Sequence, residues 1–397
     1  MSKRDADASA TLLRRTTMRP MSTVTWAFPT TIVFGAGALG ALPEQIRRAG
    51  GTRALIVADP GVTRAGIVAK IVARLEAENL PHAVFDAVDP NPVEKNVLDG
   101  VRAYKEAKAD LIVTVGGGAP LDTGKLIALK ATHDRPLVDY DDATGGDRFV
   151  TSSVPPIIAI PTTAGTGSEV GRSGVVTLAA TARKTVIFSP YLLARAALLD
   201  PDLTTSLPAR VTAATGFDAL THCLEAYVSL GDHPMADAIA LGGLELCARY
   251  LARAVETGSD LEARGGMMKA AMMGAVAFQK GLGACHSLAH PLSSEKGLHH
   301  GLANALCLPA VVRWNADIIG AEKRDHLLRA LGATGDLADA IVALRGRLKL
   351  PSGLREEGVT EADISKLADK AFEDACHRSN PRPVTRDDLA TLYRASL

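Results

Sequence analysis

Aromatic residues, net charge and long apolar runs are all scarce in this sequence. Phe, Trp and Tyr make up 4% of the 397 residues, which leaves little surface for stacking on nucleic-acid bases. Lys plus Arg and Asp plus Glu number 44 each, so no net field attracts nucleic acid or an anionic membrane. No apolar run reaches the roughly 18 residues that a membrane span requires. We therefore expect neither a nucleic-acid partner nor a membrane.

Cysteine is also sparse, and targeting signals are missing. The five cysteines are an odd number, lie far apart and include no C-x-x-C pair, which is typical of reduced thiols. Residues 1–24 lack the apolar core of a secretory signal, and Asp5 and Asp7 argue against an organelle transit peptide. We expect a cytoplasmic protein whose residues 1–24 form a disordered extension.

The remaining chain divides into two kinds of pattern. Up to about residue 205, strand-like runs alternate with amphipathic helical runs, and the clearest strand-and-turn segments are 53–61, 110–115 and 154–163. This alternation predicts βαβ units, a parallel sheet and a Rossmann-like nucleotide-binding domain. After Pro208 the apolar spacing stays helical. We predict an α/β domain over 25–205 and an all-helical domain over 206–397, with the active site in the cleft between them.

A glycine triplet, Gly116 to Gly118, separates the predicted strand 110–115 from a predicted helix. Glycines at such a junction let the backbone approach a phosphate and direct helix N–H groups at it. The segment is not a G-x-G-x-x-G fingerprint, and it fails as a P-loop because Leu126 stands where Ser or Thr is required. A tight strand-to-helix turn without a ligand explains the same residues.

Further candidate cofactor contacts follow the ends of predicted strands. Asp59 can accept a hydrogen bond from an adenosine ribose and would repel the 2′-phosphate of NADP, although Asp before Pro is equally common in surface turns. Thr162, Thr163 and Thr166 lie in a polar, glycine-containing stretch where hydroxyls can donate to phosphates or to the nicotinamide amide. A polar turn is the alternative for these threonines. Lys184 is a candidate phosphate contact.

Histidines gather in one short stretch of the helical half. The chain has ten, and four of them fall within Gly281 to Gly301: His286, His290, His299 and His300. Upstream, Asp218 and His222 stand four residues apart, on one face of a predicted helix. One carboxylate and several imidazoles favour a divalent-metal site, with chance clustering of core and surface histidines as the alternative. No Ser/His/Asp or Cys/His arrangement indicates a protein nucleophile.

Seven segments in order resemble the iron-containing (group III) alcohol dehydrogenases. They are GGGAPLDTGK, AIPTTAGTGSEV, LLDPDLTTSLP, GFDALTHCLEAY, GLGACHSLAHPL, HHGLANALCLP and NPRPVT, which together span roughly residues 29 to 384. The resemblance implies a dehydroquinate synthase-like fold, NAD as the cofactor and Fe²⁺ as the metal, with Zn²⁺ as the alternative. It also implies a homodimer or a larger homo-oligomer.

The resemblance assigns roles to individual positions. The implied metal ligands are Asp218, His222, His286 and His300, and His290 is left beside the substrate in a position suited to proton transfer. The implied cofactor contacts are Gly117, Gly118 and Asp122 around the pyrophosphate, Thr162, Thr163 and Lys184 along the rest of the dinucleotide, and Asn91 near the adenosine. Asp59 falls where an acidic residue favours NAD over NADP in relatives.

Two positions depart from the family pattern. Ala119 replaces the usual serine after the glycine triplet, which removes one hydroxyl near the phosphates. The stretch before the third ligand reads AFQKGLG, and its Lys280 would suit a carboxylate or another anion on the substrate. A solvated lysine at a helix end is the alternative for Lys280.

The expected reaction is hydride transfer between NAD(H) and a short primary alcohol or aldehyde. An ω-hydroxy acid and its semialdehyde, such as the 4-hydroxybutyrate pair, are the candidates that Lys280 favours. Three alternatives stay open: an NAD- and metal-dependent lyase of the dehydroquinate synthase type, a hydroxyacid-oxoacid transhydrogenase, and a non-catalytic metal- or nucleotide-binding protein.

Overall fold

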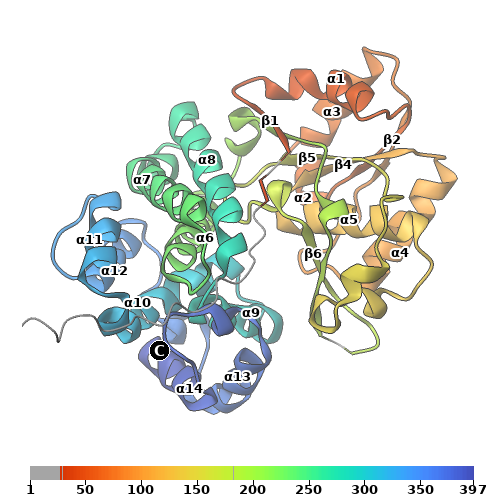
Figure 1. Cartoon of the computed structure of the whole chain (residues 1–397). Coiled ribbons are helices and arrows are strands. Elements are labelled where there is room, and N and C mark those ends of the chain that lie inside the picture. Colours follow the sequence, from red (N-terminus) through yellow and green to blue (C-terminus); the bar gives the residue numbers. More distant parts are fainter. Residues whose placement is uncertain (1–26, 29, 182) are drawn as a thin grey trace, which may run out of the picture.

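The computed structural model of the chain describes residues 27, 28, 30–181 and 183–397, so the predicted disordered extension, residues 1–24, lies outside the described residues. An α/β part extends to η7 (Pro201–Thr204), and a helical part follows it (Figure 1). The predicted fold class is therefore confirmed. None of the helices in the described ranges is both long enough and apolar enough to cross a lipid bilayer.

The α/β part is built on a six-stranded parallel sheet in the order β1-β8-β5-β4-β2-β3. Its strands are β1 (Thr31–Phe34), β2 (Ala54–Val57), β3 (His82–Phe85), β4 (Leu111–Gly116), β5 (Ile157–Pro161) and β8 (Ala196–Leu199). A separate antiparallel hairpin consists of β6 (Ser173–Thr177) and β7 (Lys184–Phe188). Strands were expected in both segments of this hairpin, but the sequence did not indicate that they pair apart from the main sheet.

Helices cover both faces of the sheet. On one face of the sheet, Ile56 and Val113 belong to a hydrophobic cluster with residues of α1 (Leu42–Arg48) and α3 (Ile67–Glu76). On the other face, Leu55 and Ile112 belong to a hydrophobic cluster with residues of α4 (Glu94–Glu106) and α5 (Gly118–Thr132). Successive side chains of a strand point to opposite faces, so a sheet covered on both sides requires the continuous Val, Ile and Leu runs seen in these strands. The short α2 (Pro60–Arg64) follows β2.

The strand order places a ligand crevice at one point of the sheet. From β2 the chain moves to β3 at one edge, then returns to β4 on the other side of β2 and continues outward to β5. Ligands of open α/β sheets bind where the order reverses, at the carboxyl ends of the strands. Here that point lies between β2, which leads into Asp59, and β4, which leads into the glycine triplet.

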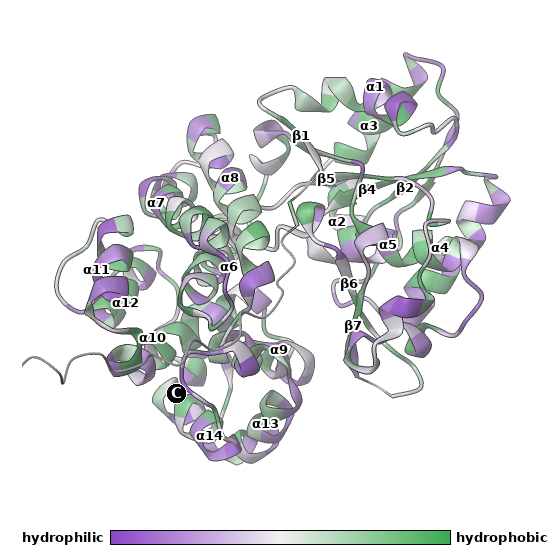
Figure 2. Ribbon diagram, viewed as in Figure 1, coloured by the Kyte–Doolittle hydropathy of each residue, from purple (hydrophilic) through white to green (hydrophobic). Residues whose placement is uncertain are grey.

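The helical part is organised around α6. Its helices are α6 (Ala209–Val228), α7 (Pro234–Glu256), α8 (Leu261–Ala277), α9 (Ala284–Lys296), α10 (His300–Ile319), α11 (Ala321–Ala330), α12 (Leu337–Arg347), α13 (Glu361–Glu373) and α14 (Arg386–Ala395). Every residue of α6 from Thr212 to Val228 is buried, as expected for a central helix. Outer helices such as α13 and α14 carry purple and green residues side by side, the pattern of helices with one face in water (Figure 2).

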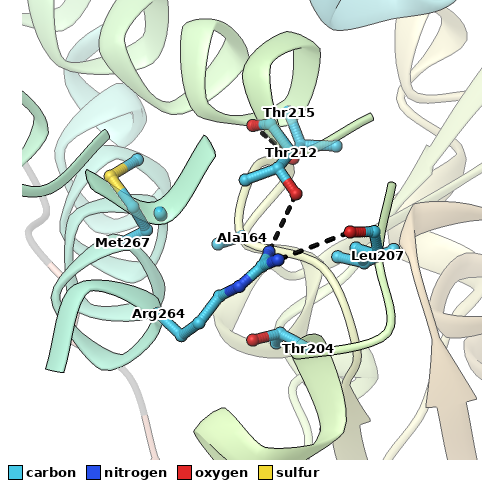
Figure 3. A pocket seen from close by; sticks show the side chains of 8 residues that line it. Ala164, Thr204, Leu207, Thr212, Thr215, Arg264 and Met267 are labelled. Atoms are coloured by element: carbon cyan, nitrogen blue, oxygen red, sulfur yellow. Dashed lines mark hydrogen bonds between the residues drawn. The ribbon is translucent and has the colours of Figure 1, made fainter. Parts of the chain in front are cut away.

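A buried arginine ties α8 to the segment that joins the two parts. The Arg264 guanidinium donates hydrogen bonds to Thr212 Oγ1 (2.8 Å) and to the Leu207 carbonyl (3.4 Å) (Figure 3). It also donates to the Gly258 carbonyl (2.8 Å). These hydrogen bonds offset much of the free-energy cost of burying the charged guanidinium. The predicted domain boundary near residue 205 falls in this joining segment, between η7 and α6, and it stays a prediction.

Candidate active site

Four side chains from three helices converge inside the helical part. The Asp218 Oδ1 atom lies 3.9 Å from His222 Nε2, 3.8 Å from His286 Nε2 and 3.5 Å from His300 Nε2. Asp218 and His222 stand one turn apart on α6, His286 lies on the first turn of α9, and His300 begins α10.

The converging atoms are electron-pair donors that fit a divalent cation. The Asn304 amide donates to Asp218 Oδ1 at 2.8 Å and lies 3.4 Å from the Nε2 atoms of His286 and His300. Burial lowers the pKa of His222 to about 4, and burial with neighbouring imidazoles lowers the pKa of His300 well below its ordinary value. Both imidazoles are therefore neutral at pH 7, which is the form that binds metals. Three imidazoles and one carboxylate suit Fe²⁺ and Zn²⁺ alike.

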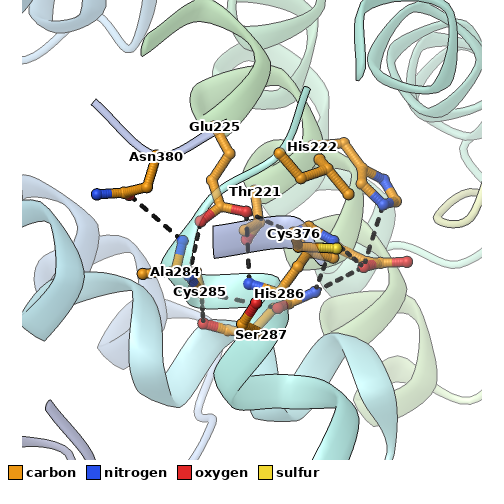
Figure 4. A network of polar contacts seen from close by, with 12 residues as sticks. Thr221, His222, Glu225, Ala284, Cys285, His286, Ser287, Cys376 and Asn380 are labelled. Carbon is orange, nitrogen blue, oxygen red and sulfur yellow. Dashed lines mark hydrogen bonds and ion pairs between the residues drawn. The ribbon is translucent and has the colours of Figure 1, made fainter. Parts of the chain in front are cut away.

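Glu225, which the sequence reasoning missed, holds His286 in place. Its Oε2 atom lies 2.6 Å from His286 Nδ1, and its Oε1 atom accepts a hydrogen bond from the Cys285 N–H at 2.7 Å (Figure 4). Nε2 of His286 is thereby turned toward Asp218. Asp218, His222 and Glu225 follow each other at i, i+4 and i+7 on α6. This spacing puts them on one helix face and was the available signal.

His290 lies beside the cluster and has a partner of its own. Its ring stacks on that of His300 with centroids 5.1 Å apart, and its Nδ1 atom lies 2.7 Å from Asp374 Oδ2. The other oxygen of Asp374 accepts hydrogen bonds from the Ser287 hydroxyl and the Cys376 N–H, each at 2.8 Å. Burial alone would raise the pKa of Asp374, but His290 and these donors hold it well below its ordinary value. Asp374 is thus a fixed anion behind His290.

The glycine triplet begins a helix that has no capping side chain. Gly117 precedes the 15 residues of α5 without a side-chain hydrogen bond to the helix N-terminus. The first N–H groups of α5 therefore remain available for an anion. A Cβ on Gly118 would lie 2.9 Å from Thr166 Cγ2, and one on Gly117 would lie 3.4 Å from Thr163 Cγ2. Glycine at these two positions therefore leaves room for residues 162–166, the threonine loop, to pack closely against the turn.

Asp59 lies close to the first glycine of the triplet. One of its oxygens accepts the N–H groups of Gly61 (2.7 Å) and Val62 (2.9 Å) at the start of α2, and a Cβ on Gly116 would lie 3.3 Å from the other. Gly116 has φ of 144°, a value that L side chains rarely adopt. Thr162 donates its N–H to the Gly116 carbonyl at 2.9 Å. Asp59 and the threonine loop therefore both lie against the triplet, and their contacts with a cofactor stay predictions.

Asp122 and Lys125 of α5 bind the protein itself. Asp122 accepts a hydrogen bond from the Ser168 hydroxyl (2.5 Å) with one oxygen and from the Val175 N–H (3.1 Å) with the other. The ammonium of Lys125 is fully buried and donates to the carbonyls of Ser168 (2.7 Å) and Ser173 (2.8 Å). Asp122 therefore joins α5 to Ser168 and to β6, and its expected place beside the pyrophosphate stays a prediction.

Two other predicted cofactor residues lie on the rim of the α/β part. Lys184 begins β7, where burial of its ammonium lowers its pKa while the charges of Asp122 and Asp218 act in the opposite direction. Its charge is thus felt both at α5 and at the histidine cluster. Asn91 is exposed in the turn before α4. Its predicted adenosine contact stays a prediction.

Lys280 does not face a substrate position. Its side chain is 1% exposed, and its ammonium forms an ion pair with Asp237 of α7 and a 3.0 Å hydrogen bond with the Tyr227 carbonyl. Burial lowers the pKa of Lys280, and the Asp237 carboxylate opposes that effect. Because the charge is already neutralised within the helical part, we do not retain Lys280 as a contact for a substrate anion.

Two family models, one for each part of the chain, together match most of its residues. Iron-containing alcohol dehydrogenase matches residues 29–201, and the C-terminal model of the Fe-containing alcohol dehydrogenase family matches residues 212–397. The chain belongs to the iron-containing alcohol dehydrogenase family. This membership confirms the predicted family and the predicted class of enzyme, an NAD-linked oxidoreductase.

Relatives of this iron-containing alcohol dehydrogenase match nearly end to end. It is 42% identical to 4-hydroxybutyrate dehydrogenase of Cupriavidus necator, over 91% of this chain and 96% of that protein. It is 39% identical to 1,3-propanediol dehydrogenase of Klebsiella pneumoniae, over 92% and 97%. Among solved structures, a 1,3-propanediol oxidoreductase superposes with a TM-score of 0.90 at 37% identity, covering 95% of this chain and 100% of that one.

A second solved structure contains the cofactor. Sulfoacetaldehyde reductase from Bifidobacterium kashiwanohense in complex with NAD⁺ superposes with a TM-score of 0.85 at 30% identity, covering 94% of this chain and 99% of that one. Family membership implies a metal and NAD(H) for the present chain. The lyase and the non-catalytic alternatives are therefore set aside, and the transhydrogenase alternative stays open.

Proposed function

We propose that this enzyme interconverts a short ω-hydroxy acid and its semialdehyde, with 4-hydroxybutyrate and succinic semialdehyde as the leading pair. The reaction rests on one observation, the convergence of Asp218 with three imidazoles beside His290. The choice of an acid rests on the 42% identity to a 4-hydroxybutyrate dehydrogenase, since Lys280 no longer supports it. A neutral diol is the second candidate, because propanediol dehydrogenases are 39% identical.

The metal is assigned to Asp218, His222, His286 and His300, with Fe²⁺ as the first choice and Zn²⁺ as the alternative. A divalent metal bound there supplies a Lewis acid for the alcohol or carbonyl oxygen. Glu225 fixes the ring orientation of His286 through its 2.6 Å contact with Nδ1. Burial keeps His222 neutral, so that its lone pair is available as a ligand.

The cofactor is assigned to the crevice between β2 and β4. The uncapped N–H groups of α5 bind the pyrophosphate, with the Thr163 and Thr166 hydroxyls beside them. Asp59 accepts from the adenosine ribose and disfavours a 2′-phosphate, which makes NAD the preferred cofactor over NADP. NAD supplies the hydride acceptor.

His290 is assigned to proton transfer. Asp374 holds Nδ1 at 2.7 Å, which leaves Nε2 for exchange with the substrate hydroxyl or with water. The side chain of His290 is 32% exposed, so a path to solvent exists. His290 is therefore placed to pass the hydroxyl proton out of the cleft.

The test is anaerobic NADH oxidation by Fe²⁺-loaded enzyme with succinic semialdehyde and with butanal, a neutral aldehyde of similar length. We expect a preference of about tenfold or more in kcat/KM for the acid, which is about 1.4 kcal/mol of transition-state binding. An Asp218→Asn variant is the control for metal-dependent turnover.

Each other outcome rejects a different part of the proposal. Equal rates, or faster turnover of butanal, would reject the hydroxy-acid assignment and leave a general alcohol dehydrogenase. Hydride transfer from a hydroxy acid to an oxo acid without net consumption of NADH would indicate the transhydrogenase. No turnover of either aldehyde would reject the assignment of the catalytic residues.

A further inference from the structure

We propose that His290, Asp374 and Cys376 form a second metal site, one for a thiophilic divalent cation such as Zn²⁺ or Cd²⁺, next to the four-residue cluster. One ligand atom from each of the three side chains lies within 4.8 Å of the other two. Asp374 ends α13 and Cys376 begins η10 (Cys376–Ser379), while His290 reaches them from α9. The three donors therefore meet from two separate segments of the fold.

Hydrogen bonds within the protein fix the geometry of this site before any ion binds. The Cys376 N–H donates to Asp374 Oδ1 at 2.8 Å, and the Ser287 hydroxyl donates to the same oxygen at 2.8 Å. Asp374 Oδ2 is turned toward His290 Nδ1, 2.7 Å away. An ion that replaces this hydrogen bond would gain two ligands whose positions are already fixed.

The donor set favours softer cations than the neighbouring cluster does, although Zn²⁺ suits both. Nitrogen, oxygen and sulfur ligands together suit Zn²⁺ and softer ions, whereas Asp218 and its three imidazoles contain no sulfur. The charges also balance, because the Asp374 carboxylate and the Cys376 thiolate neutralise a dication. The thiol gives up its proton to water as the sulfur–metal bond forms. Three protein ligands leave a fourth position open for water.

Solvent reaches this site and does not reach the other thiols. The side chains of His290 and Asp374 are 32% and 21% exposed. Cys376 is partly exposed, whereas the remaining cysteines of the chain are buried: Cys223, Cys247, Cys285 and Cys307. Cys376 is therefore the most accessible of the five thiols, and because burial and the nearby Asp374 raise its pKa, an ion binds it by displacing the thiol proton.

Occupation of the site would inhibit the enzyme. The ion would occupy the Nδ1 atom of His290 and displace the Asp374 contact, which removes the pair assigned to proton transfer. This consequence rests on the proposed function, whereas the binding of the ion does not. Inhibition by soft divalent cations is therefore expected even when the four-residue cluster keeps its Fe²⁺.

The test is a Cd²⁺ titration of Fe²⁺-loaded enzyme under anaerobic conditions, without NAD. A thiolate-to-cadmium charge-transfer band in the ultraviolet, followed as a difference spectrum, reports the second site alone, because the four-residue cluster has no sulfur. We expect one equivalent of Cd²⁺ to produce the band in the unmodified enzyme and in a Cys247→Ala control. Cys376→Ser should abolish it and raise the half-inhibitory Cd²⁺ concentration about tenfold or more, or about 1.4 kcal/mol in binding free energy.

The other outcomes overturn the site. No band in the unmodified enzyme, or a band that persists in Cys376→Ser, would show that these residues do not bind the ion. Cys376→Ala, checked by circular dichroism and Fe²⁺ content, replaces Cys376→Ser if the serine variant does not fold. Turnover of succinic semialdehyde without Cd²⁺ is measured on the same samples. Absence of that turnover in the unmodified enzyme would count against the proposed function. The charge-transfer band would still show whether the second site binds Cd²⁺.

Discussion

Individual side chains in the active site act through buried partners that set their orientation. His286 depends on Glu225 and His290 depends on Asp374, and in each pair the carboxylate binds Nδ1 of the imidazole. The pairs differ in setting. Glu225 is buried at 2% exposure, whereas the Asp374 side chain is 21% exposed. Removing the buried partner should therefore have the larger effect on the geometry of its histidine.

Replacing Glu225 by Gln should weaken metal binding. The amide cannot support His286 as the carboxylate does, and losses of outer-shell partners typically cost about 10- to 100-fold in metal affinity. Competition titration of Fe²⁺ against a chelator, under anaerobic conditions, measures the change in affinity at the four-residue cluster. Glu245→Gln, at an exposed position of α7, is the matched control and should leave the affinity unchanged. Equal affinities in the two variants would contradict the assigned role of Glu225.

Replacing Lys280 by Met should affect stability and leave substrate preference intact. The change removes the partner of Asp237, whose side chain is 32% exposed, so we expect a loss of about 2 kcal/mol in unfolding free energy, below the cost of breaking a fully buried pair. Urea denaturation measures the loss. The ratio of kcat/KM for succinic semialdehyde and butanal should stay within about twofold of the unmodified enzyme. A selective loss of acid turnover would restore Lys280 as a substrate contact.

Two short elements, the first turn of α5 and the threonine loop, fit together because neither carries a bulky group at the contact. Gly118→Ala places a Cβ 2.9 Å from Thr166 Cγ2, which should displace the loop and weaken NADH binding by about tenfold. Adding Thr166→Ser removes that methyl group, and the double variant should regain most of the affinity. Fluorescence titration with NADH measures both. A double variant no better than Gly118→Ala would show that the clash is not the cause.

The element η5 (Ser168–Val170) carries a buried acid that should make stability depend on pH. Burial raises the pKa of Glu169 to about 7, with Lys125 acting in the opposite direction. The unfolded chain has the ordinary value of 4.5, so the folded protein binds more protons between pH 4.5 and 7. The contribution of Glu169 to the free energy of unfolding is therefore fully present below pH 4.5 and is lost as the pH rises through 7. The total loss is about 3 kcal/mol.

Glu169→Gln removes this dependence and provides the check. Urea unfolding at pH 5 and at pH 8 should show a smaller difference in unfolding free energy for the variant than for the unmodified enzyme. The variant should also gain stability at pH 8, where the carboxylate would be buried in its charged form. A difference between the two pH values that is the same in both proteins would contradict the assignment.

The molecule as a whole should be stabilised by its metal, because the four assigned ligands lie on α6, α9 and α10. A cation bound only by the folded state adds about 2.7 kcal/mol at a concentration of 100 Kd. A chelator should therefore lower the Tm, and Fe²⁺ should restore it. Asp218→Asn should have a low Tm that neither treatment changes. Calorimetry that shows no effect of the chelator on metal-loaded enzyme would contradict the site.

The fold class and most of the site positions followed from local patterns in the sequence. Alternating strand and helix periodicities predicted the parallel sheet, and the later change to i, i+3, i+4 spacing predicted the helical part. Asp218 and His222 lie one turn apart on one helix, so their proximity was a local property. His286 and His300 came from the family resemblance, because their approach to Asp218 depends on how separate helices pack.

Other features depend on contacts between residues far apart in the chain. Glu225 meets His286 across 61 positions, Asp374 meets His290 across 84, and Asp237 meets Lys280 across 43. No periodicity reports such pairs, since each is created by helices or loops that pack together only in the folded protein. The same reason made Lys280 look available for a substrate anion, whereas packing pairs it with Asp237 inside the protein.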